Sequence, residues 1–152
     1  MIKESKWNQF GAEGLEVQGI VIHDTNSKLS ARDLFNWLDD ECTTSQGCHF
    51  LIDDKENIPV MPENWKTWST GKGNDYAFNH CIAVEICDCS DPEARAIAEK
   101  RAIRKIKALM KKYNLDKNRL YFHYEFNERT YCPHLLLDKY GTKKNFVEEN
   151  FK

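Results

Sequence analysis

Short apolar segments alternate with amphipathic helical segments along this chain, and this alternation constrains the fold more than any other feature. Each apolar segment holds four to seven residues, which is the length of a buried strand rather than of a buried helix. They are Val17–His23, Cys48–Asp53, Cys81–Cys87 and Leu120–His123, with a shorter strand, broken by prolines, at Ile58–Met61. Strands that alternate with helices predict an α/β fold, in which helices pack on the faces of a mixed central sheet.

The helical segments carry recognisable start and stop signals. Ser30–Asp33 is typical of a capping box, and apolar side chains recur behind it at the spacing of a helix of about three turns. Asp91 and Pro92 predict the start of a longer helix that ends near Asn114. Two shorter helices are expected further along the chain, from Cys132–Pro133 to about Gly141 and over Thr142–Phe151.

The segment Pro62–Asn79 differs from its neighbours because it is polar and rich in glycine. We therefore expect a long surface loop there rather than an element of the core. Its aromatic residues Trp65, Trp68 and Tyr76 have two interpretations. They line a groove that binds a glycan or a peptide, or they pack onto the domain.

Size and charge narrow the classes of protein to which the chain can belong. Its 152 residues suit one domain spanning residues 1–152, with a core large enough to fold alone. The 22 basic and 24 acidic residues give a net charge of −2, which argues against a nucleic-acid partner bound through a basic surface. No apolar run approaches the ~18 residues of a membrane span, so no membrane partner is expected. No apolar signal core follows Met1–Lys6, so we expect synthesis in the cytoplasm without a signal peptide.

The six cysteines leave two possibilities, three disulfides or free thiols. Free thiols are favoured, because the chain lacks an export signal and its core does not need covalent links. The spacing of Cys87 and Cys89 is too short for a zinc-finger pair, and no second pair matches it. A cysteine with a chemical role therefore needs partners of another residue type.

Two histidines lie at the ends of predicted strands. His23 closes the strand that begins at Val17, and His123 closes the strand that begins at Leu120. Ligand sites of open α/β sheets lie outside the carboxyl ends of the strands. Cys132 lies beside a predicted helix start, where a thiolate is favoured. Two histidines and one thiolate can form a catalytic zinc site with one position open for water, whereas the alternative is that the histidines are structural.

Glu85 lies inside the strand predicted over Cys81–Cys87. Side chains alternate between the two faces of a strand, so Ile82, Val84 and Ile86 form a bulky apolar face. The other face carries Glu85 among small side chains, which leaves room for a cavity. A carboxylate there is costly unless it is paired or used. We interpret Glu85 as a general base beside the metal, and the alternative is an edge-strand residue that faces water.

Six short motifs occur in a recognisable order between about Gly19 and Leu137. They are Ile22–Thr25, Cys48–Asp54, Trp68–Gly71, Asn79–Cys87, His123–Glu125 and Cys132–Pro133. This ordered set resembles the type-2 N-acetylmuramoyl-L-alanine amidase family, which includes phage endolysins, bacterial autolysins, the muropeptide-recycling amidase and the peptidoglycan recognition proteins. The resemblance implies one zinc amidase catalytic domain, without a separate cell-wall-binding domain. It also implies that His23, His123 and Cys132 bind Zn²⁺ and that Glu85 is the family's catalytic glutamate.

The sequence departs from the family pattern around this site. Many relatives carry a lysine two positions before the metal cysteine, where this chain has Thr130, as catalytic peptidoglycan recognition proteins do. Arg129 precedes it, and the resemblance leaves both Arg129 and Thr130 as candidates to stabilise an oxyanion. Cys48 stands where some relatives have a catalytic tyrosine, and Ser69 stands where relatives often have histidine.

The remaining candidates concern the substrate groove and the other histidines. His49, Trp68 and Asn26 are assigned to the groove, and a structural role for His49 stays open. His80 and His134 are interpreted as non-ligands, with His134 a spare candidate should Cys132 not bind the metal.

The resemblance implies zinc-assisted hydrolysis of the amide between the lactyl group of N-acetylmuramic acid and L-alanine. The substrate is then peptidoglycan or a muropeptide, and we expect a monomer that acts on the cell wall after release from the cytoplasm in which it is made, the host's in the case of a phage protein. A phage endolysin or an autolysin is favoured. The alternatives are a non-catalytic peptidoglycan-binding module on the same fold and a cytosolic muropeptide-recycling amidase.

Overall fold

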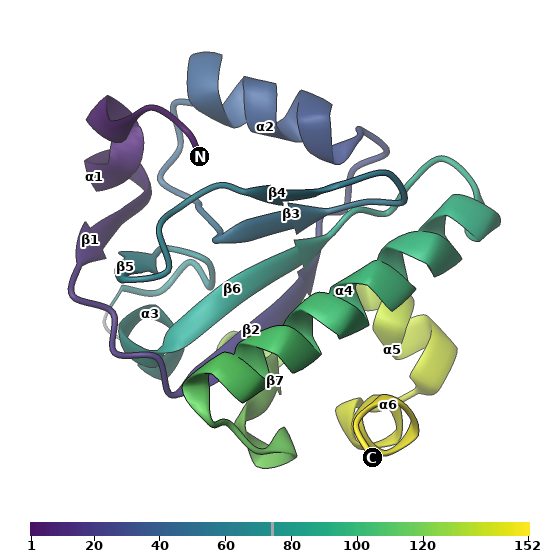
Figure 1. Ribbon diagram of the computed structural model, residues 1–152. Helices are drawn as coiled ribbons and strands as arrows, with labels where there is room; N and C mark the ends of the chain where they lie inside the picture. Colours follow the sequence, from purple (N-terminus) through teal and green to yellow (C-terminus); the bar gives the residue numbers. More distant parts are fainter. Residues whose placement is uncertain (74) are drawn as a thin grey trace.

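A five-stranded mixed sheet forms the centre of the molecule in a computed structural model that describes residues 1–73 and 75–152 (Figure 1). Asn74, in the predicted surface loop, lies outside the described residues. The strand order is β4-β3-β6-β2-β7, formed by β2 (Gly19–Asp24), β3 (Phe50–Ile52), β4 (Asn57–Pro59), β6 (Cys81–Ile86) and β7 (Leu120–Phe122). The longer helices are α2 (Ala31–Asp40), α4 (Pro92–Tyr113), α5 (His134–Tyr140) and α6 (Lys143–Asn150). The predicted α/β class is confirmed.

The sheet is parallel except at one edge. β6 pairs in parallel with β2 and β3, β2 also pairs in parallel with β7, and β4 runs antiparallel to β3. The carboxyl ends of β3, β6, β2 and β7 therefore lie along one edge of the sheet. β2 is buried along its whole length and β6 along nearly all of its length, which explains their continuous apolar sequences.

Helices cover the faces of the sheet. Figure 1 shows α4 lying across one face, with α5 and α6 beside it. Phe50 and Phe122 point to this face, because the Lys105 ammonium of α4 lies 3.7 Å from the centroid of the Phe50 ring and Phe122 packs against Phe146 of α6. α2 packs against β3 and β4.

The helix boundaries follow the signals in the sequence. The Ser30 hydroxyl accepts a hydrogen bond from the Asp33 amide at the start of α2, and the Asp91 carboxylate accepts one from the Glu93 amide at the start of α4. α4 ends at Asn114, which adopts the left-handed conformation with a φ of 53°.

The prediction of a surface loop over Pro62–Asn79 is wrong. The segment contains β5 (Trp65–Thr67) and α3 (Tyr76–His80), and both Trp65 and Thr67 are buried. Trp65 packs against Trp7, with ring centroids 5.2 Å apart. A few well-placed aromatic contacts thus override the polar composition of the segment, which confirms packing onto the domain for Trp65.

A partner strand that the sequence did not indicate makes β5 possible. β1 (Gly11–Glu13) pairs antiparallel with β5, after the short helices η1 (Glu4–Lys6) and α1 (Trp7–Phe10). The backbones approach so closely that a Cβ atom on Gly11 would lie 1.7 Å from the carbonyl oxygen of Lys66. Only glycine fits this position, and a single glycine in a polar context gives no strand signal.

All six cysteines are free and buried, which agrees with the prediction of reduced thiols. Among the described residues, no helix combines the length and the apolar character that a membrane span requires.

Candidate active site

The parallel register of the sheet brings three polar side chains to one place on its edge. His23 is the residue before the last in β2, and its Cα lies opposite that of Glu85 in β6. On the other side of β2, Ile22 lies opposite Phe122, the last residue of β7, so His123 follows at the same level. Three strands that are distant in sequence therefore deliver His23, Glu85 and His123 to one site.

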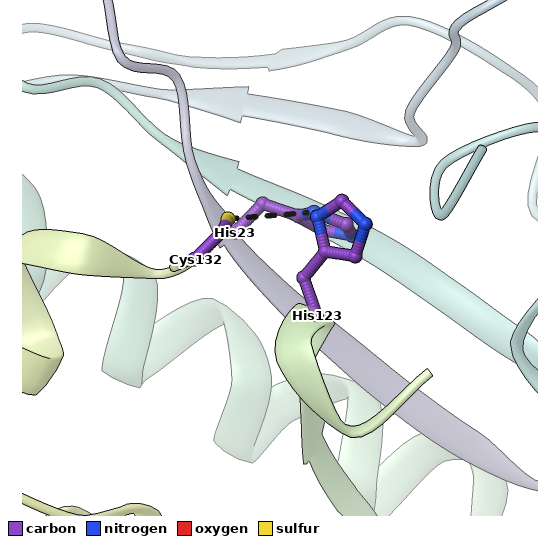
Figure 2. Close-up of side chains that lie close together, drawn as sticks. All are labelled: His23, His123 and Cys132. Atoms are coloured by element: carbon purple, nitrogen blue, oxygen red, sulfur yellow. Dashed lines mark hydrogen bonds between the residues drawn. The ribbon is translucent and has the colours of Figure 1, made fainter. Parts of the chain in front are cut away.

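Cys132 completes the cluster from the loop before α5 (Figure 2). The Nδ1 atoms of His23 and His123 are 3.1 Å apart, and Cys132 Sγ is 3.9 Å from His23 Nδ1. All three donor atoms lie within 4.8 Å of one another. The structure therefore brings together the three residues that the sequence assigned to one metal site.

Hydrogen bonding sets which nitrogen of the His123 ring is free. His123 Nε2 donates to the carbonyl oxygen of Thr70 at 3.3 Å, which leaves a lone pair on the Nδ1 atom that faces His23. The buried Nε2 of His23 has no hydrogen-bond partner in the described part of the chain. Burial, and then the charge of His123, lower the pKa of His23 well below its ordinary value, and burial lowers the pKa of His123 as well. Both rings are therefore neutral near pH 7, which is the form that binds a metal.

The donor set and its spacing fit a zinc ion. With Zn–N distances of about 2.0–2.1 Å and a Zn–S distance of about 2.3 Å, the edges of a tetrahedral site are about 3.3 Å between nitrogens and about 3.6 Å between nitrogen and sulfur. The observed separations of 3.1 Å and 3.9 Å lie close to these values. Three protein donors leave a fourth position open, which is the arrangement of catalytic rather than structural zinc sites.

Asp24, the last residue of β2, fixes the segment that carries Cys132. Its Oδ2 accepts a hydrogen bond from the Leu135 amide at 2.7 Å, in the first turn of α5, and its Oδ1 accepts one from the Arg95 guanidinium at 2.6 Å. The Cys132 thiol lies 3.9 Å from the Asp24 carbonyl oxygen. Asp24 thus ties the strand of His23 to the loop of Cys132. Sequence reasoning missed it, although a second polar residue directly after His23 on an apolar strand was an available signal.

The expected lowering of the Cys132 pKa by a helix N-terminus is wrong. Burial, and then the negative charge of Glu85, raise the pKa of this thiol above its ordinary value. The helix N-terminus does not offset these two effects, because Cys132 lies outside α5, which begins at His134, and the Leu135 amide of its first turn already donates to the Asp24 carboxylate. A bound cation, rather than the helix, has to stabilise the thiolate.

Glu85 lies beside the three donors, with its Oε1 atom 3.8 Å from His23 Nδ1. Burial, and then Asp24 and Asp88, raise the pKa of Glu85 to about 8. A carboxyl group that exchanges its proton near neutral pH is suited to general acid–base work. The alternative of an edge-strand residue is wrong, because β6 lies between β3 and β2 inside the sheet.

The cluster lies in a cleft of about 670 Å³. α2 lines one side of it, and the segment 130–134 also contributes to the lining. Glu85 and Leu51 line the cleft, whereas their neighbours Val84 and Phe50 point to the other face of the sheet, on which α4 lies. The cleft therefore opens on the face of the sheet opposite α4.

The predicted accessory residues divide between the cleft and the surface outside it. Asn26 and Thr130 line the cleft, whereas Arg129 is exposed and does not belong to the lining. Sequence reasoning missed Trp37 and Tyr131, which line the cleft and are 41% and 64% exposed. An aromatic residue outside the apolar stripe of α2 was the available signal for Trp37.

His49 and Trp68, which were assigned to the substrate groove, are not among the residues that line this cleft. His49 is fully buried, and its Nε2 lies 2.7 Å from the Trp65 carbonyl oxygen while its Nδ1 accepts a hydrogen bond from the Ala83 amide at 2.9 Å. Trp68 stacks on Phe78, with ring centroids 4.0 Å apart, and does not line the cleft. The two side chains hold the 65–78 segment against the rest of the domain.

The other two histidines lie outside the cluster of donors found among the described residues. His80 Nδ1 lies 3.4 Å from the Glu16 carbonyl oxygen, near the opposite end of the sheet from His23. His134 lines the cleft, with its Nε2 atom 3.2 Å from Asp88 Oδ2.

Comparison with known proteins gives one consistent family. The sequence profile of a family described as N-acetylmuramoyl-L-alanine amidase matches residues 13–135. The N-acetylmuramoyl-L-alanine amidase CwlA of Bacillus subtilis strain 168 is 30% identical over 141 residues, which cover 91% of this chain and 51% of that protein. The chain thus spans about half the length of this curated relative.

Solved structures agree with this match. The structure of PlyL superposes with a TM-score of 0.90 at 25% sequence identity, over 99% of this chain and 94% of that chain. A mutant endolysin from Bacillus subtilis superposes with a TM-score of 0.80 at 28% identity, over 90% of this chain and 89% of that chain.

Proposed function

This chain belongs to the N-acetylmuramoyl-L-alanine amidase family, and on that premise we propose that it is a zinc-dependent hydrolase of the amide bond between N-acetylmuramic acid and L-alanine in peptidoglycan. One observation carries the proposal: His23, His123 and Cys132 converge in an open cleft with Glu85 beside them. A non-catalytic peptidoglycan-binding module has no need for a general base next to three metal donors.

Each of the three donors has a defined part in holding the metal. His23 and His123 would bind it through their Nδ1 atoms, and Cys132 would bind it through Sγ. The hydrogen bond from His123 Nε2 to Thr70 keeps that ring in the required tautomer and orientation. A zinc ion held there supplies Lewis acidity, which lowers the pKa of water toward neutrality and polarises a carbonyl group.

Glu85 is the proton carrier of the proposed reaction. Its carboxylate accepts a proton from the attacking water and then gives a proton to the nitrogen of L-alanine as the amide bond breaks. The site prepares it for both steps, since burial and two nearby carboxylates, Asp24 and Asp88, bring the pKa of Glu85 to about 8. A nearby cation favours the ionised form, which readies Glu85 to act first as a base.

Thr130 is the better placed of the two candidates for stabilising charge on the scissile carbonyl oxygen. Thr130 belongs to the lining of the cleft, and its amide donates to the Asn127 carbonyl oxygen at 2.9 Å, which fixes the loop. Arg129 is exposed outside the cleft. We therefore assign the role of oxyanion donor to the Thr130 hydroxyl.

The substrate is the intact wall rather than a soluble fragment alone, as in an endolysin or an autolysin. The support is likeness to the structure of a mutant endolysin from Bacillus subtilis and an open cleft to which both α2 and the 130–134 segment contribute. On this proposal the protein is made in the cytoplasm and reaches the wall after release.

Digestion of purified sacculi, followed by mass analysis of the products, tests the proposal. We expect new free amino termini on L-alanine with intact glycan strands, loss of this activity with a chelator, and recovery on addition of zinc. New reducing ends, or full activity in excess chelator, would contradict it. A Glu85→Gln variant that binds zinc normally but releases no L-alanine termini serves as the matched control for the role of the base.

A further inference from the structure

Positive charge is concentrated in one segment of a chain that is acidic elsewhere. Residues 100–119 carry nine basic residues and one acidic residue, whereas the rest of the chain carries 13 basic and 23 acidic residues. The overall net charge of −2 therefore hides a strongly basic region, most of which lies on α4. Such a field attracts anions to one side of the molecule and repels them from the others.

Four of these residues form a stripe along α4. Lys100, Arg104, Lys107 and Lys111 follow one another at spacings of four, three and four positions, which places them on the same side of a helix. All four are exposed. At a rise of about 1.5 Å per residue, the stripe extends over roughly 16 Å.

The stripe adds no ion pair to the described part of the fold. The Lys107 ammonium lies 5.6 Å from the centroid of the Phe151 ring. Like charges four positions apart on a helix repel each other. The helix is therefore weakened by the pair Lys100 and Arg104 and by the pair Lys107 and Lys111. The helix dipole favours a cation only in the last turn, which accounts for Lys111 and not for Lys100 or Arg104.

The stripe and the cleft lie on different sides of the sheet. α4 covers the face to which Phe50 points, and the cleft opens on the face that carries Glu85 and Leu51. A ligand bound along the stripe therefore leaves the cleft free for substrate. This arrangement is suited to holding the protein near its substrate and not to positioning the bond that is cut.

We propose that this basic stripe binds a linear, phosphate-bearing anionic polymer of the bacterial cell wall and so retains the protein at the wall. A single anion would meet only one or two of the cations, whereas a flexible chain can follow all four over roughly 16 Å. The acidic remainder of the molecule disfavours a broad anionic surface such as a membrane, which would approach it too. The choice of a wall polymer over other polyanions rests on the proposed function.

Wall binding by two charge-matched variants tests this inference. One variant replaces the stripe (Lys100→Gln, Arg104→Gln, Lys107→Gln, Lys111→Gln), and the control replaces four exposed lysines elsewhere (Lys28→Gln, Lys55→Gln, Lys144→Gln, Lys152→Gln). Both are made in a Glu85→Gln background so that the walls stay intact. Co-sedimentation is measured with Gram-positive walls before and after removal of phosphodiester-linked polymers with hydrofluoric acid.

We expect the stripe variant to bind native walls at least about tenfold more weakly than its parent, and the control to bind like the parent. Binding of the parent should fall with salt, with a slope near −3 in the logarithms for about four released counterions, and should fall on extracted walls. Equal binding by the stripe variant and its parent, or equal binding to extracted walls, would overturn the inference. If the parent binds double-stranded DNA or anionic phospholipid vesicles more tightly than native walls, the wall polymer is rejected as the occupant of the stripe.

A second measurement separates this inference from the proposed function. With Glu85 intact, the stripe variant should cleave a soluble muropeptide at the rate of the wild type, because the stripe lies away from the cleft. Loss of soluble activity as large as the loss of wall binding would show that the stripe is not a separate surface. Absence of soluble activity and of wall lysis in the wild type would instead reject the amidase proposal, while the binding result would still decide the stripe.

Discussion

Two buried histidines in neighbouring parts of the same sheet have opposite surroundings. His49, just before β3, is 0% exposed and both ring nitrogens are paired, one with the Trp65 carbonyl oxygen and one with the Ala83 amide. His23, near the end of β2, is 2% exposed, yet its Nε2 is unpaired among the described residues, and its Nδ1 faces the Nδ1 of His123.

The difference shows how a structural histidine is told from a metal ligand. A buried polar group without a partner costs free energy, so a fold keeps one where another purpose requires it. Both ring nitrogens of His49 have hydrogen-bond partners within the protein itself. In the region of His23, the Nδ1 atoms of His23 and His123 and the Cys132 thiol lie close together, and a cation is a partner that all three can share.

The largest expected effect concerns zinc affinity. His23→Ala should weaken zinc binding by roughly a thousandfold or more, because it removes one of three protein donors from a site whose total binding free energy is of the order of 10–16 kcal/mol. His49→Ala should leave zinc affinity in the folded protein within a few-fold of wild type. Competition with a chromophoric chelator measures both, and similar losses in the two variants would break the comparison.

Glu85→Gln comes next and sharpens the comparison on the side of His23. The amide cannot accept the proton of water, so kcat should fall by about 10²–10⁴-fold while one zinc ion stays bound. The release of L-alanine termini from sacculi measures kcat, and metal analysis of the same sample measures the bound zinc. Wild-type kcat in this variant would remove Glu85 from the mechanism.

For the free energy of unfolding we expect the reverse order, with a larger loss in His49→Ala than in His23→Ala. His49→Ala removes two buried hydrogen bonds and leaves a cavity, so the free energy of unfolding should fall by about 2–4 kcal/mol. In zinc-free protein, His23→Ala should cost less than His49→Ala because His23 has fewer bonds to lose. Urea unfolding of zinc-free samples tests this order, and a larger loss at His23 would mean that His23 supports the fold.

Acid sensitivity gives a smaller, specific effect. Burial lowers the pKa of His49 to about 4 from an ordinary value near 6.5, so the unfolded chain binds a proton at a pH where the folded protein does not. The stability that neutral His49 provides is present above pH 6.5 and is lost as the pH falls toward 4. This group should account for about 2 kcal/mol of the stability lost between pH 7 and pH 5.

His49→Gln lacks that titration and should show a shallower decline in the free energy of unfolding over the same pH range. The difference between the two curves isolates His49 from the other acid-sensitive groups. Parallel curves for the variant and the wild type would show that His49 is not held neutral by its surroundings.

The smallest expected effect distinguishes the two oxyanion candidates. Thr130→Val should lower kcat by about tenfold, the value of one hydrogen bond of about 1.4 kcal/mol, whereas Arg129→Gln should change it by less than about twofold. Initial rates on a soluble muropeptide measure both. The opposite order would move the role to Arg129.

The sequence predicted the region of His23 better than the region of His49 for a physical reason. Polar residues at the ends of apolar strands are visible in the sequence, and the parallel register then aligns His23, Glu85 and His123. The partners of His49 are backbone atoms of Trp65 and Ala83, which any residue type offers, so no pattern indicates them.

The same reasoning explains the other differences between prediction and structure. β5 depends on the packing of Trp65 against Trp7, a contact between segments far apart in the chain. The position of Cys132 depends on Asp24, whose carboxylate occupies the amides of α5 that were expected to favour the thiolate. Local sequence patterns therefore indicate the regular helices and strands. The positions of the segments between them depend on contacts between residues that are far apart in the chain, which no local pattern shows.

X-ray absorption spectroscopy of the zinc-loaded protein tests the central claim most directly. The account predicts one sulfur at about 2.3 Å and two imidazole nitrogens at about 2.0–2.1 Å, with one further light atom, and loss of the sulfur shell in Cys132→Ser. The His49→Ala spectrum should match that of the wild type. A shell without sulfur, a shell with two or more sulfurs, or a changed spectrum in His49→Ala would contradict the assignment of His23, His123 and Cys132 as the metal site.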